Sequence, residues 1–117
     1  MNDTINLAAK LATFSDHWSP RTVAQINNFD VMVVKAKGEF VWHKHEETDD
    51  FFLVLKGILE IQMRDRTVTL GPGEMFVVPR GVEHCPKATE VVHVLLIEPR
   101  GTPNTGDTKT AAPRKTA

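Results

Sequence analysis

The stretch VWHKHEETDD, residues 41 to 50, gathers side chains that bind metal ions or carry protons. His43 and His45 have one residue between them, and on an extended strand residues i and i+2 point to the same face. Two imidazoles that project side by side can chelate a metal ion. Because so short a pair also arises on exposed strands without any function, a metal site needs further ligands.

Further candidate ligands lie at the ends of neighbouring runs. A carboxylate stands at the start of FFLVLK, contributed by Asp49 or Asp50, and alternation places Asp50 on the same face as Phe52 and Val54. His84 follows a second, turn-rich stretch, GPGEMFVVPRGVEH. Imidazole and carboxylate together suit divalent Fe, Mn, Ni, Cu, Co or Zn, and these ligand types single out none of them.

These ligands need a sheet that brings strand ends together. From Arg21 onward, short β-branched runs alternate with turn residues, and FVWHKH, FFLVLK, ILEIQMR and EVVHVLLIE are among the predicted strands. About seven to nine short strands are expected, at the spacing typical of a sandwich or barrel. The strands should be antiparallel, because no helical crossovers separate them.

The chain divides into an arm, one domain and a tail. Residues 1–20 are predicted to form an N-terminal arm that contains a loose segment or a short helix behind a cap at Asp3 or Thr4. Residues 21–98 are predicted to form the barrel. Residues 99–117 are rich in Thr, Pro, Ala and Gly, so a disordered tail is predicted there.

The composition excludes several classes of partner. Fourteen basic and fifteen acidic side chains leave a formal net charge of -1, so no broad field recruits nucleic acid or an anionic membrane. No stretch approaches the ~20 apolar residues of a membrane-spanning helix. The lone cysteine, Cys85, is predicted to be a buried structural thiol, and the N-terminal residues lack a signal-peptide pattern. A cytoplasmic protein is therefore predicted.

The two histidine-bearing stretches resemble the paired motifs of the cupin superfamily. The first motif, G-x5-H-x-H-x3/4-E-x6-G, is matched by Gly38, His43, His45, Asp50 and Gly57. This chain departs from the motif in having one residue fewer after the first glycine and an aspartate where the motif has glutamate.

The second cupin motif, G-x5-P-x-G-x2-H-x3-N, is matched by Gly73, Pro79, Gly81 and His84, with Ala88 in place of the final Asn. Several phrases, such as HKHEETDDFFLVLKG, are similar to those of small single-domain cupins described as resembling mannose-6-phosphate isomerase. That description records likeness and not activity.

The resemblance implies an all-β antiparallel jelly-roll barrel that holds one metal ion by three histidines and a glutamate. His43, His45 and His84 occupy the histidine positions, and Asp50 stands in the glutamate position. Aspartate is one methylene shorter, so either Asp50 binds after a small strand shift, Asp49 replaces it, or three histidines hold the metal alone. Using Asp49 would require a register slip that turns apolar residues to the wrong face, so Asp50 is the prediction.

The predicted function is a metal-dependent enzyme of isomerase, lyase or dioxygenase type that acts on a small polar metabolite in the barrel. Open coordination positions on a metal held by four protein ligands would permit such chemistry. The alternative is a non-catalytic cupin that binds a small molecule or metal as a sensor or store. The apolar strands VMVV and VVHVLLI exceed what one barrel interior needs, so a homodimer is also predicted.

Overall fold

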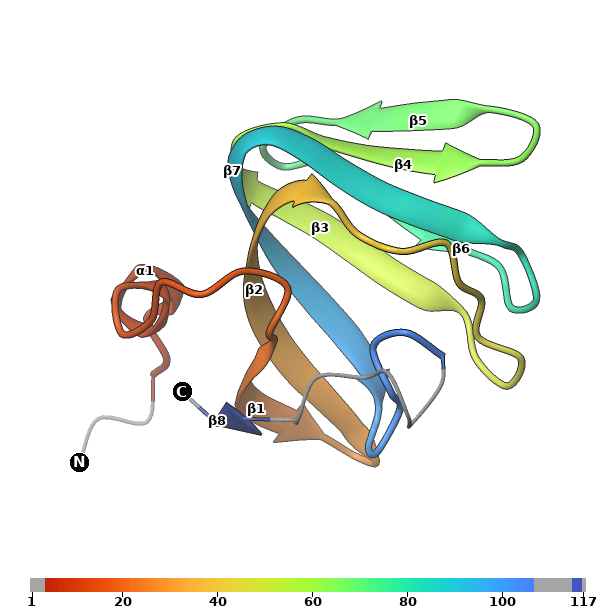
Figure 1. Ribbon diagram of the computed structural model, residues 1–117. Coiled ribbons are helices and arrows are strands. Elements are labelled where there is room, and N and C mark those ends of the chain that lie inside the picture. Colours follow the sequence, from red (N-terminus) through yellow and green to blue (C-terminus); the bar gives the residue numbers. More distant parts are fainter. Residues whose placement is uncertain (1–3, 107–114, 117) are drawn as a thin grey trace.

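The computed structural model describes residues 4–106 and 115–116. Its sheet folds around a common interior, with a short helix outside (Figure 1). The elements are α1 (Leu7–Leu11), β1 (Arg21–Ile26), β2 (Phe29–Glu39), β3 (Asp50–Lys56), β4 (Leu59–Met63), β5 (Thr67–Leu70), β6 (Met75–Val78), β7 (His84–Pro99) and β8 (Lys115–Thr116). The predicted all-β fold is confirmed.

The long strand β7 organises the barrel. Its first residues pair antiparallel with β4, and its later residues pair antiparallel with both β2 and β3. Antiparallel pairs also join β1 to β2, β3 to β6 and β4 to β5, whereas β8 runs parallel to β1. His84 at the start of β7 is therefore held beside β4, while the rest of the strand forms part of the barrel wall.

The core is built from alternate residues of four strands. The inward and almost fully buried side chains of β2, β3, β4 and β7 include Val34, Ala36, Phe52, Val54, Leu59, Ile61, Val92, Val94 and Leu96. Burying each aliphatic side chain of this kind contributes about 1.5–3 kcal/mol. A one-residue slip of β3 would turn its whole inward set outward, so the core fixes the register that places Asp50 inside.

The predicted strand over residues 40–45 is wrong, because only an isolated bridge between His43 and His84 forms there. The Phe40 amide donates to the Pro86 carbonyl, and His43 pairs with His84, so three residue steps oppose two. An extra residue of this kind interrupts a ladder and redirects the side chains beside it. The bulge leaves Trp42 outside, where the Arg64 guanidinium lies 3.8 Å from its ring centroid, and turns His43 inward.

The arm carries a helix, but its cap differs from the prediction. Asn6 caps α1 by accepting a hydrogen bond of 3.0 Å from the Ala9 amide. The predicted cap at Thr4 is not used, and Asp3 lies outside the described residues. None of the helices in the described part of the chain has the length and apolarity needed to cross a bilayer.

The described part of the tail lies against the arm. Asn104 donates a hydrogen bond of 3.2 Å from Nδ2 to the Trp18 carbonyl, although the two residues are far apart in the sequence. The disordered tail predicted for residues 99–117 stays a prediction for residues 107–114 and 117, which lie outside the described residues.

Candidate metal centre

His43 and His84 are brought together by their own backbones. The His43 amide donates to the His84 carbonyl at 3.0 Å, and the His84 amide donates back to the His43 carbonyl at 2.9 Å. The two imidazole centroids lie 4.3 Å apart, and both side chains are buried. This reciprocal pair fixes two of the four predicted ligands before any side-chain contact is considered.

Asp50 enters the cluster from the first position of β3. It pairs with Val78 of β6 and is only 4% exposed. Its Oδ2 lies 2.9 Å from His84 Nε2 and 3.3 Å from His45 Nε2. One candidate ligand atom from each of His43, His45, Asp50 and His84 lies within 4.8 Å of the others. The structure thus brings all four predicted ligands together as a group that could hold a metal ion.

Asp49, the other carboxylate considered, points away from this group. Its side chain is half exposed, and Oδ1 accepts a hydrogen bond of 2.9 Å from the Arg80 amide. The shorter reach of aspartate does not keep Asp50 from the imidazoles, because its carboxylate already contacts two of them.

Backbone carbonyls orient two of the imidazoles. His43 Nδ1 lies 2.8 Å from the Val41 carbonyl, and His84 Nδ1 lies 2.9 Å from the Val82 carbonyl. A carbonyl only accepts, so each Nδ1 carries a proton and each Nε2 faces the cluster, where His84 Nε2 meets an Asp50 oxygen at 2.9 Å in a contact that a bound cation would satisfy. Metal-binding histidines are commonly oriented by such a hydrogen bond from the other ring nitrogen.

The ionisation states of His43 and Asp50 also suit metal binding. Burial lowers the pKa of His43 to about 4, so this imidazole is neutral at pH 7. Burial opposes the ionisation of Asp50, but its contacts with His45 and His84 outweigh burial and lower its pKa. Neutral imidazoles and an ionised carboxylate are the forms that bind divalent metal ions.

Two buried polar atoms provide a further test of fit. Within the described residues, neither Asp50 Oδ1 nor His45 Nε2 makes a hydrogen bond, although both atoms are shielded from solvent. His45 Nε2 is near Asp50 Oδ2 without suitable hydrogen-bond geometry. Buried polar atoms are normally paired, and a bound cation would satisfy both. The donor set therefore fits a divalent transition metal.

Comparison with protein families gives a match to the cupin domain over residues 30–98, which is more than half of the chain. The matched range contains all four candidate ligands. The chain belongs to the cupin family. Family membership agrees with the sheet topology and with the paired motifs in the sequence.

Several relatives resemble this cupin over most of its length. A cupin-2 domain containing protein from Shewanella frigidimarina NCIMB 400 is 49% identical, with a TM-score of 0.81, and the match covers 82% of this chain and 94% of that chain. Protein NMB1881 from Neisseria meningitidis is 32% identical, with a TM-score of 0.76, and the match covers 83% and 99% of the two chains. YdbB, an uncharacterized protein of Bacillus subtilis (strain 168), is 28% identical over 85 residues, 72% of this chain and 75% of YdbB.

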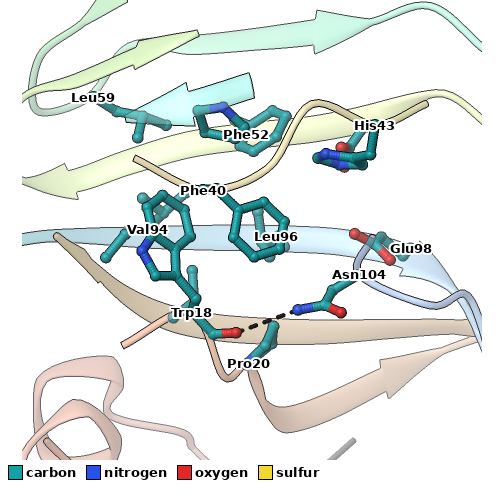
Figure 2. A pocket seen from close by; sticks show the side chains of 14 residues that line it. Trp18, Pro20, Phe40, His43, Phe52, Leu59, Val94, Leu96, Glu98 and Asn104 are labelled. Carbon is teal, nitrogen blue, oxygen red and sulfur yellow. Dashed lines mark hydrogen bonds between the residues drawn. The ribbon is translucent and has the colours of Figure 1, made fainter. Parts of the chain in front are cut away.

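A cavity adjoins the candidate ligands of this cupin. His43 and Asp50 line it, together with Trp18, Phe40 and Phe52 among others. Figure 2 shows the aromatic side chains around the cavity, with His43 and Glu98 toward one end. The space is narrow and leaves about 40 Å³ for the centres of water-sized atoms.

Sequence reasoning missed several residues of the cavity wall. Glu98 is buried at an inward position of β7, and its place in the alternation after Val94 and Leu96 could have revealed it. Trp18 and Asn104 come from the arm and the tail, and no local pattern predicts their meeting. Trp18 adopts a left-handed φ of 58° and is held by hydrogen bonds of 2.9 Å to the carbonyls of Lys35 and Lys37.

His93 lies away from the candidate metal centre. It faces outward from β7 and lines a shallow pocket with Leu11 of α1 and Leu55 of β3. Burial lowers the pKa of His93, and the nearby Lys35 and Lys56 lower it further. His93 is therefore a histidine of the same strand that can serve as a control for His84.

Cys85 is expected to be unreactive in the folded protein. It is 0% exposed, and burial raises the pKa of its thiol, so little thiolate is available to an attacking reagent. A disulfide reagent such as Ellman's should label Cys85 fully in denaturant and show no release of its coloured thiol over the same time in buffer. Rapid labelling of the native protein would contradict the buried placement.

Proposed function

We propose that this cupin is a metal-dependent enzyme that acts on a small molecule bound in the barrel cavity. The observation that carries the proposal is that His43 and Asp50 belong both to the ligand cluster and to the cavity wall. A molecule in the cavity therefore lies against the metal position. A divalent transition metal there would supply Lewis-acid polarisation of a substrate oxygen, as in isomerases and lyases, or, for iron, redox chemistry with dioxygen.

The residues of the chain prepare this site in three ways. Carbonyls of Val41 and Val82 hold the His43 and His84 rings so that Nε2 faces the cluster. The pKa of Asp50 is lowered, so it offers a carboxylate at neutral pH. The apolar walls of the cavity exclude water from the bound molecule, which strengthens its polar contacts.

Metal analysis and a substrate screen test the proposal together. Protein purified without added metal should contain up to about one Fe, Mn, Ni, Cu, Co or Zn ion per chain, and a chelator should remove it together with any turnover. A protein that neither retains nor takes up any of these ions would refute the proposal. A ligand that binds tightly and is recovered unchanged from the metal-loaded protein would favour the non-catalytic binder.

The partner is a small molecule in this proposal, since a formal charge of -1 gives no attraction to nucleic acid or anionic membranes. A cytoplasmic location remains a prediction from the sequence. The predicted location and the expected lack of nucleic-acid and membrane partners do not depend on which reaction the protein catalyses.

We also propose that the protein is a homodimer through the outer face near β6. Among the described strands, β6 pairs only with β3, so one of its edges is open. Met75 and Val77 of this strand are 52% and 39% exposed. An open edge with apolar side chains is a typical site of strand pairing between chains.

Light scattering at micromolar concentrations should report a dimer for the native protein and a monomer for Val77→Glu, because a charge at the interface would be desolvated. The control is Val91→Glu, because Val91 is also 39% exposed but lies far from Val77. Val77 and Ile97 both pair with Phe51, and Val91 comes six residues before Ile97 on β7. Six residues of strand span roughly 20 Å. A native monomer, or equal effects of the two variants, would contradict this interface.

A further inference from the structure

The chemistry of the cavity wall limits what it can hold. Ten of its fourteen lining residues are apolar, and the four polar ones are His43, Asp50, Glu98 and Asn104. No lysine or arginine is among the lining residues. A polyol would bury hydroxyl groups without partners. The wall therefore favours a molecule that is largely apolar.

The shape of the cavity favours a flat molecule. The Trp18 and Phe40 rings stack with centroids 4.8 Å apart and an interplanar angle of 25°, and Phe52 also lines the cavity. Only about 40 Å³ is open to the centres of water-sized atoms, so a small, narrow molecule is favoured. Aromatic rings pair favourably with other rings, offset or edge to face, so an aromatic ring suits a wall that carries Trp18, Phe40 and Phe52.

The polar groups are not spread evenly. In Figure 2, His43 and Glu98 lie toward one end, and Trp18 and Leu59 lie toward the other. Asp50, which contacts His84 and His45, belongs to the polar end through its position in the ligand cluster. A ligand that matches this wall has one polar end and one apolar end.

We propose that the cavity selects a hydroxylated aromatic ring, a small phenol, with its oxygen toward His43 and Asp50 and its ring against Trp18, Phe40 and Phe52. The inference rests on the proposed function, because the oxygen would be bound at the metal. It replaces the small polar metabolite expected from the sequence with an apolar ring that carries a single oxygen substituent.

Calorimetric titration of the zinc-loaded protein tests this selectivity with phenol, cyclohexanol and glycerol. Zinc has no redox chemistry, so binding is measured without turnover. Phenol should bind at least about tenfold more tightly than cyclohexanol, which has the oxygen but no flat ring, and than glycerol, which has hydroxyl groups but no apolar ring. Equal or weaker binding of phenol would overturn the inference.

Tryptophan fluorescence locates the bound ring. The protein has two tryptophans, and Trp42 lies outside the cavity against Arg64. In a Trp42→Phe variant, emission excited at the red edge of the tryptophan band comes from Trp18 alone. Phenol should change this emission with the same saturation curve as the heat of binding. A calorimetric signal with no change in Trp18 emission would place the ring elsewhere and contradict the proposal.

A matched pair of variants on β7 provides the structural control. Leu96 lines the cavity, whereas its neighbour Leu95 faces the outside of the barrel. Leu96→Phe should fill the space and weaken phenol binding at least about tenfold, with metal content unchanged, while Leu95→Phe leaves binding unchanged. If Leu96→Phe does not fold, Ala36→Val adds a smaller group to the same wall and should weaken phenol binding in the same direction.

The outcomes separate this inference from the metal proposal. A protein that binds zinc but does not prefer phenol refutes the ligand class and leaves the metal centre intact. A protein that takes up no metal refutes the proposed function, and phenol binding that is then lost in Leu96→Phe would still support the aromatic slot. Phenol binding that survives in folded, metal-loaded Leu96→Phe would refute the slot itself.

Discussion

Replacing His84 with alanine is expected to weaken the binding of a divalent transition metal by more than about 100-fold, since loss of an indirect partner of a ligand already costs about 10–100-fold. His84 is 1% exposed, its Nε2 lies 2.9 Å from Asp50 Oδ2, and its backbone pairs with His43. An alanine would leave one coordination position to a water molecule in an apolar surrounding. The dissociation constant for zinc, measured by competition with a coloured chelator, gives the loss directly.

His93→Ala is the matched control, because it removes an imidazole from the outer face of the same strand. Zinc at about 100 times its dissociation constant should stabilise the native protein and His93→Ala by about 2.7 kcal/mol, or about 10 °C in melting temperature. The melting temperature of His84→Ala should not respond to zinc. His43→Ala and His45→Ala should behave like His84→Ala, and equal zinc binding in His84→Ala and His93→Ala would refute the predicted centre.

The candidate ligands could be located from the sequence because each belongs to a pattern that the core enforces. Asp50 shares the inward face of β3 with Phe52 and Val54, and a slip of one residue would expose both apolar side chains. His84 follows a turn and opens a strand, where the paired motifs also place a histidine. Local alternation and motif spacing therefore predicted the cluster that the structure assembles.

The strand over residues 40–45 could not be judged in the same way. Its alternation is correct, since His43 and His45 are buried and Lys44 is exposed. A ladder, however, needs an opposing residue at every step, and the bulge opposite Pro86 removes that match. Periodicity reports which face a side chain takes, and it does not report whether the backbone is paired.

The cavity wall is harder still to predict, because part of it comes from outside the barrel strands. Trp18 is held at the cavity by hydrogen bonds to the carbonyls of Lys35 and Lys37. Asn104 contacts Trp18 although the two residues are 86 positions apart in the sequence. Neither residue lies in a periodic segment. The ligand class therefore depends on tertiary contacts, whereas the metal ligands depend on strand register.

Asp50→Asn is expected to weaken metal binding at least about tenfold, because the variant keeps the shape of the side chain but removes the charge of the only carboxylate in the described cluster. The control is Asp49→Asn. Asp49 carries the same functional group one residue earlier, is half exposed, and accepts its hydrogen bond from the Arg80 amide. Its amide can still accept that bond, so its zinc dissociation constant should stay within about twofold of the native value.

The comparison of these two variants distinguishes the three arrangements that the sequence left open. A large loss at Asp50 alone means that its carboxylate binds the metal, which its contacts with the imidazoles of His45 and His84 support. A large loss at Asp49 alone would require the register of β3 to slip, against the burial of Phe52 and Val54. Small and equal losses at both positions would mean that three histidines hold the metal without a carboxylate. In that case the charge of Asp50 would serve to hold His45 and His84 in place, and the melting temperature of metal-free Asp50→Asn should fall while its zinc affinity is retained.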